Sequence, residues 1–321
     1  MSPAAALALA CSEQARQEIL DGEGLDAWRG LVRLVTPEQG EAEVALVTRD
    51  VWGPSTDAQL APHTRAFFEA LEHNPGLRWV HTYASGLDRP VYQRLMARGV
   101  RVTNTAGANA DAVAQTALAG FLYFARPLHV ARENQRKGVW RPVLHADVRA
   151  LSQLSILIVG WGEIGQRVGR YLTALGASYG VLRQRAEPVP SARLTDIYAA
   201  FNTHVGQADW VFFTCPLSEQ TRYLFNEQTL ARLDAERPLS VVNVARGAVV
   251  DTPSLLRAHA GGLLRHAHLD VFEEEPLPAG HPLWQAEGIL VSPHMAGASN
   301  GNRRRVLERF GELLLGYREG R

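Results

Sequence analysis

The glycines of the stretch Ser155-Ile-Leu-Ile-Val-Gly-Trp-Gly-Glu-Ile-Gly-Gln166 have the spacing of a dinucleotide-binding turn. Four apolar residues precede Gly160 and predict a strand buried on both faces of a parallel sheet, and apolar residues recur at helical spacing afterwards. In such a turn Gly160 permits the tight bend, Gly162 lets backbone approach a pyrophosphate, and Gly165 lets the helix lie close to the strand. The alternative is a strand-to-helix turn that binds nothing.

Three further stretches carry charged and polar side chains directly after predicted strands. They are Asn243-Val-Ala-Arg-Gly-Ala-Val-Val-Asp251, Leu269-Asp-Val-Phe-Glu-Glu-Glu-Pro-Leu-Pro278 and Val291-Ser-Pro-His-Met-Ala-Gly297. In open α/β sheets, ligands bind at the carboxyl ends of the strands. These stretches therefore mark a candidate site.

The elements that would position these stretches alternate between strand and helix patterns. Strands are predicted at 4–10, 31–36, 44–48, 77–83 and 100–103, and then at 156–159, 178–182, 210–214, 240–244, 266–269 and 288–292. Helices are predicted at 12–20, 64–73, 91–98, 111–125 and 302–317, with one ending near Gly138 and one beginning near Asp251. This alternation is typical of parallel α/β sheets, and six strands suit a doubled mononucleotide-binding sheet.

The length of 321 residues favours two domains. The dinucleotide sheet begins in mid-chain, after about a hundred residues of α/β pattern, and we expect the terminal helix to return to the first domain. Two crossings between domains would leave a cleft, which is a natural place for a substrate and a hinge.

The composition is that of an ordinary globular protein, with 46% hydrophobic and 21% charged residues. Lys+Arg and Asp+Glu are 33 each, so a net charge of zero gives no field that would attract nucleic acid or anionic lipid. Cys11 and Cys215 are too few for a disulfide framework or a cysteine metal site. We expect a soluble cytoplasmic protein without a metal, and we interpret the apolar N-terminal run as a strand and not as an export signal.

The four motifs, in this order and spacing, resemble the D-2-hydroxyacid dehydrogenase family over the region from Tyr83-Ala-Ser-Gly-Leu-Asp88 to Gly297. The resemblance implies two doubly wound parallel-sheet α/β domains, a Rossmann cofactor domain inserted into a flavodoxin-like substrate domain. The expected boundaries are 1–104 with 295–321 for the substrate domain and 105–294 for the dinucleotide-binding domain. The resemblance also implies a homodimer paired through the long helices before the glycine turn.

The same resemblance assigns the catalytic residues. Arg246 matches the arginine that holds the carboxylate of a 2-oxo acid and polarises its carbonyl, for which a planar guanidinium is suited. His294 matches the general acid/base, and Glu275 matches the carboxylate that orients this histidine and favours its imidazolium form.

Further positions match residues that bind substrate or cofactor. The backbone amides of Ser85 and Gly86 are expected to help Arg246 hold the substrate carboxylate, and Asp270 is expected to contact the nicotinamide carboxamide. The complete set of expected cofactor-binding residues is Gly160, Gly162, Glu163, Ile164, Gly165, Arg183, Arg185, Pro216, Thr221, Val244 and Asp270. Two positions depart from the family pattern: Ala106 stands where many members have proline, and Gln115 where many have glutamate.

The end of the second predicted strand of the cofactor domain indicates the cofactor. NAD-selective folds place Asp or Glu about 20 residues beyond the glycines to bind the ribose 2′-OH. Here that position holds Arg183, in Gly180-Val-Leu-Arg-Gln-Arg185. A guanidinium can bind the 2′-phosphate of NADP, and Arg185 is placed to assist, so we expect NADP(H) to be preferred over NAD(H).

The sequence thus predicts an oxidoreductase that reduces a small 2-oxo acid, such as glyoxylate or hydroxypyruvate, to the D-2-hydroxy acid with hydride from NADPH. The alternative is a dinucleotide-sensing regulatory protein on the same fold. Formate oxidation is disfavoured because that chemistry prefers glutamine at the position of Glu275. A nucleophilic role for Cys215 is a weaker rival, because no histidine of suitable context accompanies it.

Overall fold

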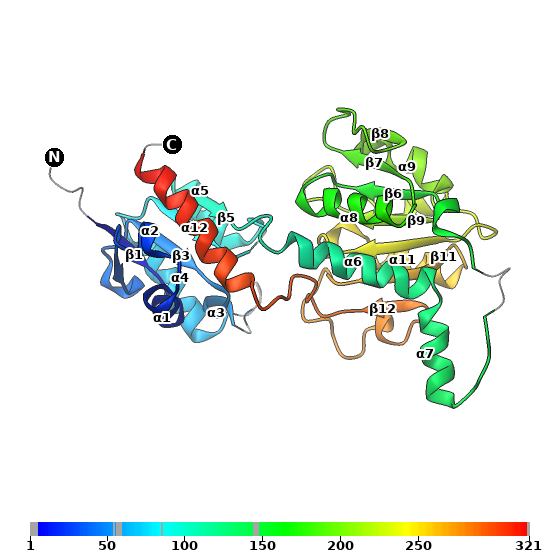
Figure 1. Cartoon of the computed structure of the whole chain (residues 1–321), viewed down its shortest axis with the longest axis horizontal. Helices are drawn as coiled ribbons and strands as arrows, with labels where there is room; N and C mark the ends of the chain where they lie inside the picture. The colour runs from blue at the N-terminus through cyan, green and yellow to red at the C-terminus, as the bar shows by residue number, and fades with distance from the viewer. Residues whose placement is uncertain (1–5, 54, 56–59, 85, 144–147, 320–321) are drawn as a thin grey trace. The chain divides into compact units, whose positions relative to one another are not determined.

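The computed structural model describes residues 6–53, 55, 60–84, 86–143 and 148–319. The chain forms two compact units, one made of Met1–Asn109 together with Ser299–Arg321 and the other of Ala110–Ala298. In the order of the chain, the second unit is therefore inserted into the first (Figure 1).

The first unit contains a five-stranded parallel sheet with the order β2-β1-β3-β4-β5. Its strands are β1 (Leu7–Ala10), β2 (Val32–Val35), β3 (Val44–Val47), β4 (Trp79–Thr82) and β5 (Arg101–Asn104). This order is that of flavodoxin-like folds, and each strand lies where an apolar run predicted one.

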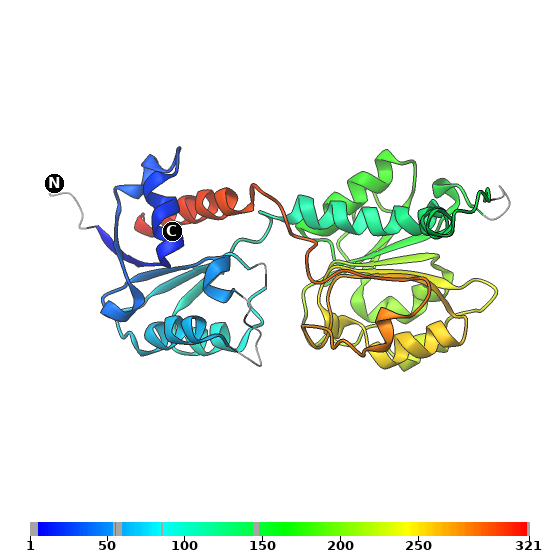
Figure 2. The same cartoon turned by 90° about the horizontal axis from the view of Figure 1, so that it is seen from below.

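Helices cover both faces of this sheet (Figure 2). One face packs against α1 (Glu13–Asp21), α2 (Asp26–Arg29) and α12 (Asn302–Arg318), and the other against α3 (Arg49–Trp52), α4 (Pro62–His73) and α5 (Pro90–Ala97). The terminal helix α12 is fixed to the first unit by Phe310, whose ring stacks on Trp79 of β4 at 5.3 Å. The expectation that the last helix returns to the first domain is confirmed.

The second unit contains a seven-stranded parallel sheet with the order β12-β11-β10-β9-β6-β7-β8. Its strands are β6 (Ile156–Val159), β7 (Tyr179–Arg183), β8 (Leu194–Ile197), β9 (Trp210–Phe213), β10 (Leu239–Asn243), β11 (Leu264–Leu269) and β12 (Ile289–Val291). Six of these match predicted strands. The expectation of six was wrong by one because β8 is a short edge strand containing Thr195 and Asp196, without the apolar run that marks the buried strands.

Two layers of helices enclose this second sheet. One face packs against α6 (Ala110–Ala125) and α8 (Glu163–Ala174), and the other against α9 (Phe201–His204), α10 (Glu227–Leu230) and α11 (Thr252–Ala260). The helix α7 (Leu128–Lys137) follows α6 and has no buried residue. Across the described ranges, no helix combines the length and apolarity that a membrane crossing needs.

Candidate active site

The glycine turn joins β6 to α8, and two of its glycines are required by the protein itself. Gly160 has a φ of 106°, and a Cβ on it would lie 2.5 Å from the backbone nitrogen of Cys215. A Cβ on Gly165 would lie 2.0 Å from the carbonyl oxygen of Gly160. At Gly162, the N-cap of α8, a Cβ would have no neighbour within 4 Å among the described atoms. Space at the start of a helix is what a pyrophosphate needs, so this turn fits a dinucleotide.

The turn also lies at the point where the strand order of the sheet reverses. Strand β6 pairs with β7 on one side and with β9 on the other, so the chain runs outward in both directions from this strand. Thr214, directly after β9, donates its hydroxyl to the carbonyl of Gly160 at 2.9 Å. Ligands of doubly wound sheets bind at such a reversal, outside the carboxyl ends of the strands.

Arg183 is the last residue of β7, the neighbour of β6. Its Nη2 lies 3.1 Å from Oε2 of Glu187, and its side chain is 28% exposed. Arg185 is 81% exposed, and its Nη1 lies 4.0 Å from Oε1 of the same glutamate. Both predicted arginines thus gather at the end of β7 around one carboxylate.

The remaining expected cofactor residues differ in what their side chains contact. Glu163 opens α8 and forms an ion pair with Arg167, and Ile164 packs against the core. Val244 is buried after β10. Thr221 is fully buried and donates its hydroxyl to the carbonyl of Pro216 at 2.6 Å, so it shapes the loop after β9 from within.

The three catalytic candidates lie in loops that follow three neighbouring strands, β10, β11 and β12. The second and third of these loops meet where Nδ1 of His294 lies 2.6 Å from Oε2 of Glu275. An ionised carboxylate only accepts hydrogen bonds, so His294 donates from Nδ1, and Nε2 is the nitrogen left for proton transfer.

Glu275 is held ionised by its surroundings. Burial alone would raise the pKa of its carboxyl, but hydrogen bonds from His294 and from the Phe272 N–H, with the charges of His294 and Arg246, outweigh burial. The pKa of Glu275 therefore lies below its ordinary value of 4.5. The bond from Phe272 N to Oε1 is 3.0 Å long, so both carboxylate oxygens are engaged.

The loop that carries Arg246 is packed directly on the loop that carries Glu275. A Cβ on Gly247 would lie 1.9 Å from the carbonyl carbon of Phe272, so only glycine allows this approach. Asn243, at the end of β10, accepts from Ala245 N at 3.1 Å and donates to the carbonyl of Arg246 at 3.0 Å. Sequence reasoning assigned Asn243 no role, and its place at the start of the motif was the available signal.

Asp270 is 1% exposed, and its carboxylate accepts from Ser292 Oγ and from the backbone amides of Met295 and Ala296. A carboxylate has about four acceptor positions, so three of them serve the loop of His294. The contact of Asp270 with a nicotinamide carboxamide stays a prediction. Ser292, which sequence reasoning also missed, is the residue that joins the two loops here.

The remaining candidates from the sequence are the substrate-binding residues Ser85 and Gly86 and the rival nucleophile Cys215. Ser85 lies outside the described residues, and Gly86 belongs to the first unit. Cys215 is buried, and burial raises the pKa of its thiol to about 12, so it is protonated and a poor nucleophile.

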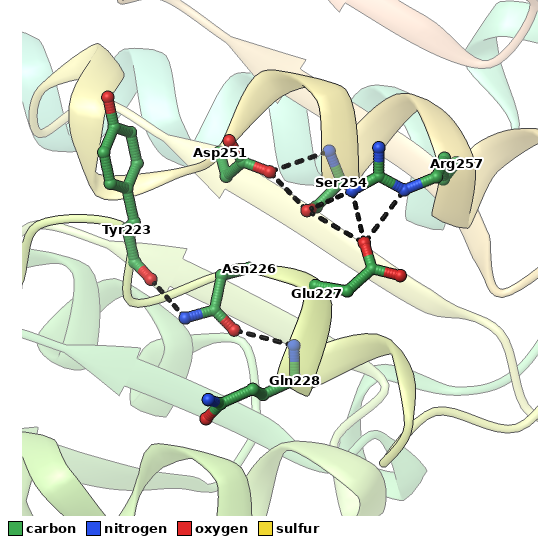
Figure 3. Close-up of a pocket in the computed structure, with 7 residues that line it drawn as sticks. All are labelled: Tyr223, Asn226, Glu227, Gln228, Asp251, Ser254 and Arg257. Atoms are coloured by element: carbon green, nitrogen blue, oxygen red, sulfur yellow. Dashed lines mark hydrogen bonds and ion pairs between the residues drawn. The ribbon is translucent and has the colours of Figure 1, made fainter.

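A separate hollow of about 580 Å³ lies between the segment around Asn226 and the start of α11 (Figure 3). Its lining residues are Tyr223, Asn226, Glu227, Gln228, Asp251, Ser254 and Arg257. Arg257 Nε donates to Glu227 at 2.9 Å, and Asp251 caps α11 by accepting from Ser254 N at 3.0 Å. Its charged groups are engaged in holding the fold, and it includes none of the expected site residues.

Comparison with known proteins identifies the family of this chain. A family model described as "D-isomer specific 2-hydroxyacid dehydrogenase, NAD binding domain" matches residues 118–296. A protein named glyoxylate reductase from Korarchaeum cryptofilum is 32% identical over 266 residues, which cover 78% of this chain and 76% of that protein. One of the same name from Pyrococcus horikoshii is 33% identical over 266 residues, with the same coverage.

A solved structure of a D-isomer specific 2-hydroxyacid dehydrogenase from Xanthobacter autotrophicus Py2, in complex with NADPH and MES, has the same fold. It superposes with a TM-score of 0.75 at 26% identity and covers 96% of this chain and 93% of that one. On the family match, the identities and the shared architecture, this chain belongs to the D-isomer specific 2-hydroxyacid dehydrogenase family and contains its dinucleotide-binding domain.

Proposed function

We propose that this dehydrogenase works as a reductase of a small 2-oxo acid, glyoxylate or hydroxypyruvate, with NADPH as the hydride donor. The observation that carries the proposal is the 2.6 Å contact of His294 with Glu275, in loops adjoining that of Arg246. The name of the relatives that are about 30% identical, glyoxylate reductase, supports the choice of a small acid.

In the proposed reaction, Arg246 holds the substrate carboxylate through two parallel hydrogen bonds and polarises the neighbouring carbonyl, helped by the amides of Ser85 and Gly86. The bound nicotinamide supplies the hydride. As negative charge develops on the carbonyl oxygen, His294 delivers the proton from Nε2. Glu275, ionised and bonded to Nδ1, fixes the ring and stabilises its charged form before the transfer.

The preference for NADPH rests on Arg183 and Arg185. A carboxylate at the end of β7 would repel a 2′-phosphate, whereas Arg183 occupies that place and can bind the phosphate by a charge-assisted pair of hydrogen bonds. Glu187 pairs with Arg183 at 3.1 Å, so this glutamate competes with the phosphate.

We further propose that the enzyme is a cytoplasmic homodimer. Both cysteines are free and buried, which suits a reducing compartment. The segment after α6 exposes several large apolar side chains, among them Leu128, Val139, Trp140 and Val143, and Trp140 is 98% exposed. Exposed apolar groups on one segment are typical of a subunit contact.

A panel of 2-oxo acids, with NADPH oxidation followed by absorbance, tests the proposal. We expect turnover on glyoxylate or hydroxypyruvate and weaker turnover on acids with larger side chains. Tight binding of NADPH without turnover on any acid would favour a dinucleotide-sensing regulator instead.

A further inference from the structure

One buried residue, Asp270, holds the backbone on both sides of the proton-donating histidine. Its carbonyl accepts the amide of His294 at 2.8 Å, while its carboxylate accepts the amides of Met295 and Ala296, each at 3.0 Å. His294 itself has a φ of 48°, in the left-handed region that residues other than glycine rarely adopt. A residue keeps such a conformation only where its surroundings fix it, and here three consecutive amides are fixed by one residue.

The carboxylate of Asp270 is in turn linked to a buried histidine. Ser292 donates its hydroxyl to Asp270 Oδ1 at 2.6 Å, and Nε2 of His268 lies 3.0 Å from the same hydroxyl oxygen. A serine has a single hydroxyl proton, and Ser292 donates it to the carboxylate of Asp270. The contact at 3.0 Å is therefore a hydrogen bond only if His268 carries its proton on Nε2 and donates it to Ser292.

The surroundings of His268 keep it neutral and in that tautomer. The residue is 2% exposed, and burial lowers the pKa of its ring below the ordinary 6.5, although the charge of Asp270 opposes this shift. Within the described part of the chain, Nδ1 has no hydrogen-bond partner, whereas Nε2 has Ser292 as an acceptor, so a single ring proton is satisfied only on Nε2.

The position of the ring is set by the facing helix. A Cβ on Gly120 of α6 would lie 2.0 Å from Nδ1 of His268, so the helix passes over the ring only because residue 120 is glycine. The pair of Gly120 and His268 thus fixes one end of a chain of hydrogen bonds whose other end is the backbone beside His294.

We propose that His268 is a positioning residue for His294, acting through Ser292 and Asp270 as one directed chain of hydrogen bonds. The inference rests on the proposed role of His294 as the proton donor. His268 does not touch the reacting groups. It orients the Ser292 hydroxyl toward Asp270, which leaves that carboxylate anchored to receive the amides of Met295 and Ala296.

The test compares two substitutions of His268 with a matched control. His268→Met substitutes an apolar side chain of similar volume and removes the donor, whereas His268→Gln places an amide N–H the same number of bonds from Cβ as Nε2 of histidine. His266→Met is the control, because His266 lies two residues earlier on the same strand and packs on Phe124 at 4.6 Å. His266 and His268 both lie on the side of the sheet that faces α6, so the control replaces the same residue type on the same face.

A misplacement of about 1 Å can lower a rate about 100-fold. For His268→Met we expect kcat to fall by about 10- to 100-fold, with the KM for NADPH within about twofold of the wild type. His268→Gln should recover at least half of the lost activity on a logarithmic scale. His266→Met should lower the melting temperature as much as His268→Met does while leaving kcat within about twofold. Near wild-type kcat in His268→Met, or equal losses in His268→Gln and His268→Met, would overturn the proposal.

A readout that needs no turnover separates this inference from the proposed function. Hydrogen exchange of the peptide that contains residues 292–298 should be at least about fivefold faster in His268→Met than in the wild type, and unchanged in His266→Met. If the wild type reduces no 2-oxo acid, the proposed function fails, and exchange alone decides the positioning role. Equal exchange in all four proteins would overturn it.

Discussion

The ion pair of Arg183 with Glu187 should limit how tightly the enzyme binds NADPH, and Glu187→Gln should lower the KM for this cofactor. Glu187 must give way, or be repelled, when a 2′-phosphate approaches Arg183 Nη2, which now lies 3.1 Å from Oε2 of the glutamate. Ion pairs on the surface contribute about 0.2–1 kcal/mol. Removing this one should lower the KM for NADPH about 1.4- to 5-fold.

Removing the arginine should change the kinetics with NADPH more than removing the glutamate does. Arg183→Gln loses a hydrogen bond between charged groups, worth about 1.5–3 kcal/mol, so kcat/KM for NADPH should fall about 10- to 150-fold while that for NADH changes little. Arg185→Gln is the matched control. Its side chain is 81% exposed and its nearest approach to Glu187 is 4.0 Å, so we expect a smaller loss.

The assay is the ratio of kcat/KM for NADPH to kcat/KM for NADH in the wild type and the three variants, at one fixed ionic strength because salt screens exposed charges. The wild-type ratio should be about ten or more. Equal use of the two cofactors by the wild type would refute the reasoning. An equal loss for both cofactors in Arg183→Gln would also refute it, since the arginine would then not read the phosphate.

Three further predictions concern stability, packing and assembly. Gly247→Ala should destabilise the fold by about 1–3 kcal/mol in denaturant unfolding, because the added Cβ would lie 1.9 Å from the carbonyl carbon of Phe272. The control is Gly30→Ala, which should leave the free energy of unfolding nearly unchanged, because Gly30 has helical backbone angles and nothing lies within 4 Å of an added Cβ. Since the pKa of Glu275 is lowered in the folded state, its ionised form stabilises the protein above pH 4.5 and this contribution is lost as the pH falls through the lowered value. The difference in melting temperature between the wild type and Glu275→Gln should therefore shrink below pH 4.5, and a difference that grows with acid would contradict the assignment. Trp140→Glu should shift the mass measured by light scattering from dimer toward monomer, and a wild type that is monomeric at micromolar concentration would defeat the dimer proposal.

The elements predicted most securely are those whose burial is visible in the sequence itself. Strand β6 is an unbroken apolar run, and the turn after it has room only for glycine at positions 160 and 165, so the glycine spacing predicts the turn. Strand β8 has no such signature, because it lies at the edge of the sheet and half of its residues are polar. Its pairing with β7 depends on tertiary structure, which the local sequence pattern of β8 does not predict.

The candidate site likewise combines residues that the sequence predicts with residues that only the structure shows. Arg246, Glu275 and His294 were recognised through the family resemblance, since residue types alone do not indicate that side chains 19 positions apart meet at 2.6 Å. The chain from His268 to Asp270 was not predicted at all. Histidine is intermediate between buried and exposed residue types, so its identity does not predict burial, and the position of His268 depends on a glycine in a helix far away in the sequence.

The proposed reaction depends most directly on His294 as the group that protonates the substrate oxygen. The decisive measurement is kcat of His294→Ala with the best acid of the panel, alongside the dissociation constant of NADPH from the fluorescence of the bound cofactor. We expect kcat to fall by about 10²–10⁴ while the dissociation constant stays within about threefold of the wild type. A His294→Ala enzyme that keeps most of the wild-type turnover would contradict the assignment.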